Sequence, residues 1–263
     1  MLGIGSKFLK ENSALSISST FHKWGSPRWF YQFSARLMPW LAGLSLLLLV
    51  GGAVWGLAFV PPDYKQGNSF RIIYIHVPAS AVAMGAYMTM AIAGAIHLIW
   101  RMKLAAMVMK AIAPIGASLT FLALLTGAVW GKPTWGTWWV WDARITSVLI
   151  LFFLYLGIIA LHQAFENRDA AAKACAVLAI VGAVNIPIIY WSVEWWYSLH
   201  QPASISFTGQ STIHPTMLRP LMATLSGMYL FFGWLLLLFV RVEILDRERN
   251  TRWVQDLICG ESR

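Results

Sequence analysis

The chain has 263 residues, of which 58% are hydrophobic and only 12% are charged. Because a soluble domain carries about 25% charged residues, this chain lacks the polar surface of a water-soluble globule. Its formal net charge of +9 would suit nucleic acid or anionic lipid. The basic residues are distributed as membrane topology requires, however, so no nucleic-acid partner is expected.

Six stretches of the chain contain no charged residue. Each is about 20 residues or longer, and a helix of that length crosses a hydrocarbon core of about 30 Å. We therefore predict an all-α membrane protein with six transmembrane helices in one membrane domain, residues 37–240. The stretches are Leu37–Pro62, Ile72–Trp100, Ala111–Gly131, Ile145–Phe165, Ala174–Val193 and Pro220–Val240.

The basic residues indicate how these helices are oriented. Six spans leave both termini on the same side of the membrane, and 15 of the 20 basic residues fall on that side. The positive-inside rule then predicts a cytoplasmic N-terminal arm (residues 1–36) and a cytoplasmic C-terminal tail (residues 241–263). Two loops, residues 61–77 and 194–219, and the segment 130–144 are expected on the opposite side, in a bacterial periplasm or its equivalent.

Proline and glycine positions modify two of the predicted spans. Pro114 and Pro187 lie within the third and fifth spans, where membrane helices tolerate proline, usually with a kink. Gly127 and Gly131 have the spacing of close helix packing.

The sequence also excludes several kinds of chemistry. Cys175 falls in the fifth span and Cys259 in the tail, so a disulfide between them is geometrically implausible. No C-x-x-C or C-x-x-C-H motif occurs, which excludes thiol redox chemistry and a covalently attached c-type haem. The Gly131-Lys132 pair lacks the glycine spacing of a phosphate loop, and no ATP site is visible. We expect a protein that is not an enzyme.

Tryptophans are concentrated between Trp130 and Trp141, where 12 residues hold five of the chain's 15 and are followed by Asp142. An aromatic belt needs only one or two tryptophans per segment end, so we interpret the cluster as a platform for a large planar ligand. The belt is the alternative. If residues 135–142 form a helix, three tryptophans and Asp142 share one face of it. If the segment is extended, the side chains of Trp139 and Trp141 point to the same side. The five are Trp130, Trp135, Trp138, Trp139 and Trp141.

Topology divides the six histidines between the two sides of the membrane. His97 lies 21 residues after His76, about 30 Å along a helix, so these two cannot bind one ligand. Imidazole is a common axial ligand of haem iron, and imidazoles beside a tryptophan platform favour a haem site. The alternative is that they are polar tips at the level of the lipid headgroups. His76, His200 and His214 fall on the outer side, and His22, His97 and His162 on the cytoplasmic side.

Charged residues near the tryptophans extend the haem interpretation. Arg71, Lys132 and Arg144 are candidates for binding the two haem propionates, and the alternative is that they anchor helix ends. In the haem interpretation, the Asp142 carboxylate orients a neighbouring donor or a residue of a partner protein. The alternative is that it only pairs with Arg144 at the surface, an interaction that contributes below about 1 kcal/mol.

Three segments resemble a known group of proteins. Trp135-Gly-Thr-Trp-Trp-Val-Trp-Asp-Ala-Arg144 is similar to the WWD signature of the haem-handling membrane proteins of cytochrome c biogenesis. Arg71-Ile-Ile-Tyr-Ile-His-Val-Pro78 and Ser192-Val-Glu-Trp-Trp-Tyr-Ser-Leu-His200 resemble the two histidine loops of one family, haem exporter protein C, also called cytochrome c maturation protein C. The resemblance extends over about residues 25–260.

This resemblance implies a six-helix protein of the bacterial inner membrane that holds haem b as cargo on its periplasmic side. His76 and His200 would be the axial iron ligands, and the WWD segment (130–144) the platform. The haem would pass to a periplasmic haem chaperone, cytochrome c maturation protein E. The other partners implied are an ABC transporter, formed by cytochrome c maturation proteins A and B, and the small single-helix protein D of the same system. His214 matches no histidine of the family pattern.

Two alternatives come from other functional classes. A haem lyase would attach haem to apocytochrome, and larger relatives of that kind carry a further histidine pair within the membrane. No histidine here lies in the middle of a predicted span. A structural subunit of an ABC transporter would carry the tryptophans as an incidental belt and would need no loop histidines. A solute channel is poorly supported because no predicted span carries a charged residue.

Overall fold

The computed structural model describes residues 25–201 and 211–259, which are mostly helical and contain no β-strand. Six helical segments in these ranges are long and apolar enough to cross a membrane, which confirms the predicted fold class. Residues 1–24 of the predicted arm and 202–210 of the second histidine loop lie outside the described residues. The spans are Pro27–Phe59, Asn68–Trp100, Lys103–Trp135, Ala143–Ala164, Arg168–Trp195 and Pro215–Arg247.

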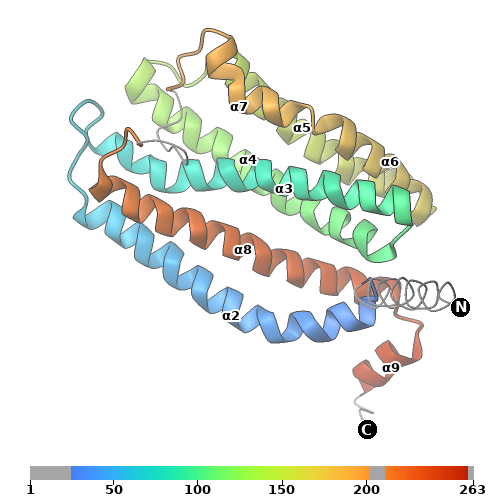
Figure 1. The fold of residues 1–263 in the computed structure, drawn as a ribbon. Coiled ribbons are helices and arrows are strands. Elements are labelled where there is room, and N and C mark those ends of the chain that lie inside the picture. Colours follow the sequence, from blue (N-terminus) through green and yellow to red (C-terminus); the bar gives the residue numbers. More distant parts are fainter. Residues whose placement is uncertain (1–24, 202–210, 260–263) are drawn as a thin grey trace, which may run out of the picture.

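The labelled elements follow the chain in this order (Figure 1). They are α2 (Pro27–Val54), the π-helix η1 (Trp55–Phe59), the 3-10 helix η2 (Asn68–Ile72), α3 (Ile73–Trp100), α4 (Lys103–Trp135), α5 (Ala143–Ala164), α6 (Arg168–Gly182), α7 (Asn185–Trp195), α8 (Pro215–Arg247) and α9 (Arg252–Cys259).

Several helices are longer than the uncharged stretches that predicted them. α2 begins at Pro27 rather than Leu37, and α8 continues past Val240 to Arg247. A span of 33 residues rises about 50 Å, whereas the hydrocarbon core is about 30 Å thick. In these longer helices the uncharged stretch therefore covers only a part, of about the length that a hydrocarbon core requires. Part of the predicted arm, residues 27–36, is helical, and a proline in the first turn suits that start.

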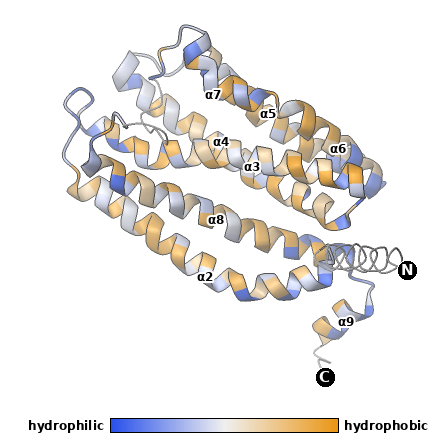
Figure 2. Ribbon diagram, in the orientation of Figure 1, coloured by the Kyte–Doolittle hydropathy of each residue, from blue (hydrophilic) through white to orange (hydrophobic). Residues whose placement is uncertain are grey.

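The bundle is organised around α3, which packs against α4, α6 and α8, while α2 packs mainly against α8 (Figure 1). Two buried tyrosines fill the centre: the Tyr155 hydroxyl donates to the Ala83 carbonyl at 2.7 Å, and Tyr87 meets Tyr155 edge-on. Apolar residues cover the middle of the helices, and polar residues gather towards their ends (Figure 2). This distribution is typical of helices that cross a membrane.

The fifth span is broken into α6 and α7 around Ala183 and Val184. Pro187 explains the break, because its ring clashes with the carbonyl four residues earlier, that of Ala183. Asn185 holds the second piece in place by donating to the Ser147 carbonyl of α5 at 2.8 Å. The predicted disturbance at Pro187 is thus a break in the helix, whereas α4 runs without interruption through Pro114.

α2 begins and α8 ends at the same end of the bundle, as an even number of spans requires (Figure 1). Near the end of α8 the buried Glu243 carboxylate accepts from Lys110 and from Arg247, both at 2.6 Å. The interaction ties α4 to α8, and removing one partner of a buried pair is far costlier than its net contribution. That this end faces the cytoplasm stays a prediction.

Candidate functional site

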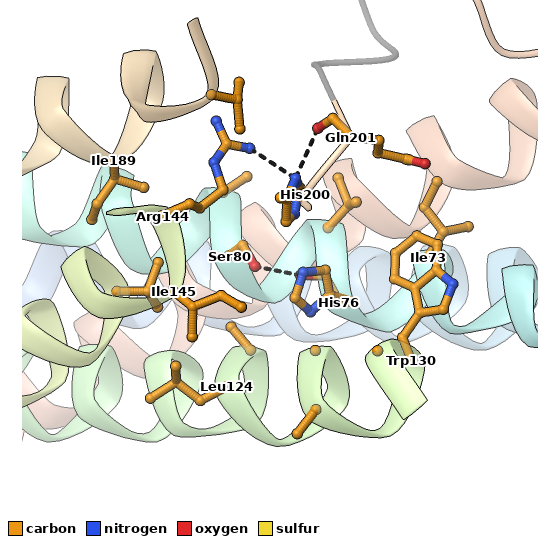
Figure 3. A pocket seen from close by; sticks show the side chains of 18 of the residues that line it. Ile73, His76, Ser80, Leu124, Trp130, Arg144, Ile145, Ile189, His200 and Gln201 are labelled. Carbon is orange, nitrogen blue, oxygen red and sulfur yellow. Dashed lines mark hydrogen bonds between the residues drawn. The ribbon is translucent and has the colours of Figure 1, made fainter. Parts of the chain in front are cut away.

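A cavity of about 340 Å³ opens among α3, α4, α5, α7 and the loop that follows α7 (Figure 3). This volume lies within the range of roughly 300–1,000 Å³ found for ligand pockets. His76 and His200 both line it, and Figure 3 shows them projecting into the same space. The structure thus brings together two histidines that are separated by 124 positions in the sequence.

His76 lies in the first turns of α3, and its ring is fixed by α4. Its Nδ1 is 3.1 Å from the Thr126 hydroxyl oxygen. That hydroxyl donates its own proton to the Leu122 carbonyl at 2.7 Å, so towards His76 it accepts. Nδ1 therefore carries the ring proton, and Nε2 keeps a free lone pair for a ligand.

Gly127 makes room for the His76 ring. A Cβ at position 127 would lie 3.0 Å from His76 Cε1, and one at Gly131 would lie 3.0 Å from the Trp135 ring. The two glycines were predicted to allow close helix packing. They instead admit an imidazole and an indole, both of which line the cavity.

His200 is held in the matching state on the other side of the cavity. Its Nδ1 lies 2.8 Å from the Gln201 carbonyl oxygen. Arg144 Nη1, which can only donate, lies 3.3 Å from the same Nδ1. The carbonyl only accepts and is the shorter contact, so it assigns the ring proton to Nδ1 and leaves Nε2 for a ligand. The guanidinium is then a charged neighbour of the ring and does not donate to it. Burial, and then the guanidinium of Arg144, hold the pKa of His200 below the usual range for histidine. The imidazole is therefore neutral at pH 7, as metal ligation requires.

Of the three predicted cations, only Arg144 lines the cavity. It lies in the first turn of α5 and donates to the Ser192 hydroxyl at 3.2 Å and the Tyr190 carbonyl at 2.9 Å, beside His200 Nδ1 at 3.3 Å. Arg71 donates to the Val60 carbonyl at 2.8 Å, and Lys132 donates to the Gly136 carbonyl at 3.1 Å. For these two the structure favours the alternative, that they anchor helix ends.

The segment after Trp135 is not a helix. α4 ends at Trp135 because Gly136 takes a left-handed conformation (φ 78°) and caps the helix. The next helix, α5, begins after Asp142, so the helical arrangement of residues 135–142 is wrong. Between these two points the chain has no regular helix.

Four of the five predicted tryptophans line the cavity. Trp141 does not, and it is 75% exposed, with its ring edge-on to that of Trp139. The Nε1 of Trp139 is buried without a partner among the described residues, so a ligand oxygen there would satisfy it. The cavity-lining tryptophans are Trp130, Trp135, Trp138 and Trp139.

Asp142 does not form the predicted surface pair. Asp142 is only 9% exposed. Among the described residues, it forms no ion pair with Arg144. One carboxylate oxygen accepts the Ile145 amide at 2.8 Å and caps α5, while the other accepts the Ser198 hydroxyl at 2.5 Å. Asp142 therefore connects the tryptophan segment to the loop of His200.

The remaining described histidines have local roles outside the cavity. The His214 side chain accepts the Thr216 amide and caps α8. His97 Nδ1 lies 3.2 Å from the Met102 carbonyl oxygen at the far end of α3, and His162 lies near the other end of α5 from Arg144. None of the three lines the cavity.

Sequence reasoning missed the polar residues that orient the side chains of the cavity. Thr126 directly precedes Gly127, which had been noted only for helix packing. Gln66 accepts from the Trp130 indole at 2.7 Å and lies in the first histidine loop. Ser192 and Ser198 lie inside the motif that ends at His200. Gln66, Ser192 and Ser198 lie in or beside the segments of the two predicted histidines, and that proximity was the available signal, since surrounding hydrogen bonds orient metal ligands. Thr126 carried no such signal.

The fold and the cavity define a multi-pass helical membrane protein whose cavity is lined by two histidines, four tryptophans and an arginine. The sequence profile of the heme exporter protein C family matches residues 20–255, and the chain belongs to this family.

Relatives named heme exporter protein C match most of the chain. The protein of Haemophilus influenzae is 51% identical over 236 residues, which cover 90% of this chain and 96% of that relative. The protein of Escherichia coli K12 is 48% identical over 244 residues, covering 93% and 98%. The protein of Bradyrhizobium diazoefficiens is 48% identical over 222 residues, 84% of each chain.

Proposed function

We propose that this protein binds haem b as cargo in the cavity, with His76 and His200 as the two axial ligands of the iron. The observation that carries the proposal is the state of the two rings. Each has its Nδ1 proton directed to an oxygen, of Thr126 or Gln201, and each keeps Nε2 for the metal. A hydrogen bond on the second ring nitrogen is the usual arrangement of metal-ligating histidines.

The rest of the cavity wall suits the porphyrin. The indoles of Trp130, Trp135 and Trp139 offer flat apolar faces. Arg144 has five N–H donors, and the contacts above use only part of them, so it can also bind a propionate. The buried N–H of Trp139 is a second donor for a carboxylate oxygen.

The protein further serves the export of haem for the maturation of c-type cytochromes. It presents haem on the periplasmic face of the inner membrane and delivers it to the haem chaperone, cytochrome c maturation protein E. It works beside the ABC transporter formed by cytochrome c maturation proteins A and B and beside the small protein D. The names of its relatives support export, and the exposed rings of Trp138 and Trp141 give an acceptor protein a surface beside the cavity.

A transfer role is favoured over the two alternatives. A haem lyase of the larger type would need a second histidine pair within the membrane. The described part of the chain has only His97 and His162 as further span histidines, both in the last turns of their helices. A purely structural subunit would need neither oriented histidines nor a cavity between them.

The absorption spectrum of the protein purified in detergent tests the binding proposal. A six-coordinate, low-spin haem with two nitrogen ligands is expected, either co-purified or after addition of haem. A protein that takes up no haem, or binds it without a nitrogen ligand, contradicts the proposal.

Fusions to a reporter that is active only in the periplasm test the orientation. A fusion after Lys132 is expected to be active and one after Arg168 inactive, because 15 of the 20 basic residues lie on the side of the termini. The reverse pattern would move the cavity to the cytoplasmic side and remove the proposed delivery to a periplasmic acceptor.

Replacing Thr126 by valine is expected to weaken haem binding. Valine keeps the shape of the side chain but cannot accept the Nδ1 proton of His76, so the ring loses the contact that fixes its tautomer. Loss of such a partner typically lowers metal affinity by about 10–100-fold, which a titration followed by absorbance measures. Thr126→Ser keeps the hydroxyl and is the control. Equal affinities of Thr126→Val and the wild type would show that Thr126 does not orient His76.

A further inference from the structure

The carboxylate of Asp142 connects the start of α5 to the loop that carries His200. One oxygen is used for the α5 cap, and the other accepts the Ser198 hydroxyl at 2.5 Å. The same hydroxyl oxygen accepts the backbone amide of His200 at 3.0 Å. Ser198 thus donates in one direction and accepts in the other, which uses its donor and an acceptor site consistently.

The loop between α7 and His200 is fixed mainly by polar contacts. After α7 the chain leaves the helix, and Tyr197 is almost fully exposed. The ring of Trp135 lies near that of His200, with centroids 6.3 Å apart, but the two rings are tilted rather than stacked. The hydrogen bonds through Ser198, together with the guanidinium of Arg144 beside the ring (Figure 3), join this loop to the first turn of α5.

We propose that Asp142 is a positioning residue that, through the Ser198 hydroxyl, holds His200 at the distance from His76 that a single metal centre requires. This rests on the proposed haem site and adds a role for Asp142 and for Ser198. The tryptophan segment and the second histidine loop then act as one unit, because the residue that ends the former fixes the latter. Charge assistance makes such hydrogen bonds roughly twice as strong as neutral ones.

Ser198→Ala tests the proposal most directly, since it removes the hydroxyl and leaves both histidines in place. Haem is expected to remain bound through His76, but a five-coordinate, high-spin fraction appears and haem retention falls roughly 10-fold or more. Added imidazole is expected to restore the low-spin spectrum. Ser198→Thr, which keeps a hydroxyl, is expected to resemble the wild type. Ser118→Ala, on the exposed face of α4, is the matched control and should change nothing.

Asp142→Ser separates positioning from helix capping. Serine caps a helix about as well as aspartate, but it has no second oxygen at the position of Asp142 Oδ2, which accepts from Ser198. This variant is expected to accumulate normally in the membrane and to reproduce the spectrum of Ser198→Ala. Because both changes break one connection, adding Ser198→Ala to Asp142→Ser should cause no further loss.

Three outcomes would overturn the proposal. The first is full low-spin ligation in Ser198→Ala, and the second is a double variant whose loss of haem retention is the sum of the two single losses. The third is degradation of both single variants, which would show that the connection is structural. A wild-type protein that binds no haem is a different result. It would remove the proposed function itself, and the spectrum of the wild type is recorded first for that reason.

Discussion

Replacing either His76 or His200 by alanine is expected to convert the bound haem from six-coordinate, low-spin to five-coordinate, high-spin, and replacing both to abolish binding. Each ring supplies one Nε2 to the cavity and no other described histidine lines it, so a lost ligand has no substitute among them. The shift of the Soret band and the spin state seen by electron paramagnetic resonance measure the change. In cells, c-type cytochromes are expected to be lost while the protein remains in the membrane.

The same substitution at other histidines provides matched controls. His97→Ala and His162→Ala are expected to leave the spectrum intact, because these residues lie towards the opposite ends of α3 and α5 from the cavity. His214→Ala removes a cap of α8 and is expected to cost about 1 kcal/mol of stability without changing ligation. A larger spectral effect of His214→Ala than of His200→Ala would reassign the second ligand.

The fold could be predicted from the sequence because the membrane imposes a simple rule on it. Every backbone polar group in hydrocarbon must be paired within a helix, so a long uncharged stretch such as Ile145–Phe165 has one available structure. Helix ends could not be predicted in the same way. Between the hydrocarbon and the water both charged and apolar residues are tolerated, and α2 therefore begins ten residues before the first uncharged stretch.

Depth in the membrane reduced the candidate ligands to three histidines, and the family resemblance selected two of them, but the contacts that orient these two could not be predicted. His76 and His200 line one cavity, whereas His214, which was sorted to the same side, does not. The partnership of Asp142 with Ser198 rather than Arg144 depends on how the loop after α7 folds back over α5. Because Asp142 and Arg144 are only two residues apart, the sequence suggests that they pair. In the structure Asp142 instead caps α5, and Arg144 donates to a carbonyl of α7.

The tryptophans divide into a group in the cavity wall and a group at the exposed rim. Trp139 lines the cavity, Trp138 lines it while 57% exposed, and Trp141 is exposed and outside it. Changing Trp138, Trp139 and Trp141 together to alanine is expected to leave the protein inserted but unable to pass haem to its acceptor. Trp→Phe changes keep a flat aromatic face and are expected to be mild.

Single substitutions are expected to separate binding from transfer. Trp139→Ala removes an indole face and a buried donor. Because an aromatic pair contributes about 0.5–1.5 kcal/mol beyond its area burial and a hydrogen bond to a charged group about 1.5–3 kcal/mol, haem affinity is expected to fall at least about 10-fold. Trp141→Ala touches no cavity wall and is expected to bind haem normally but to slow its transfer to the chaperone. Equal effects of Trp139→Ala and Trp141→Ala on haem binding would contradict this division. Degradation of the triple alanine variant would show that the tryptophans are structural. Cytochrome maturation at the normal rate in the triple variant would rule out the platform.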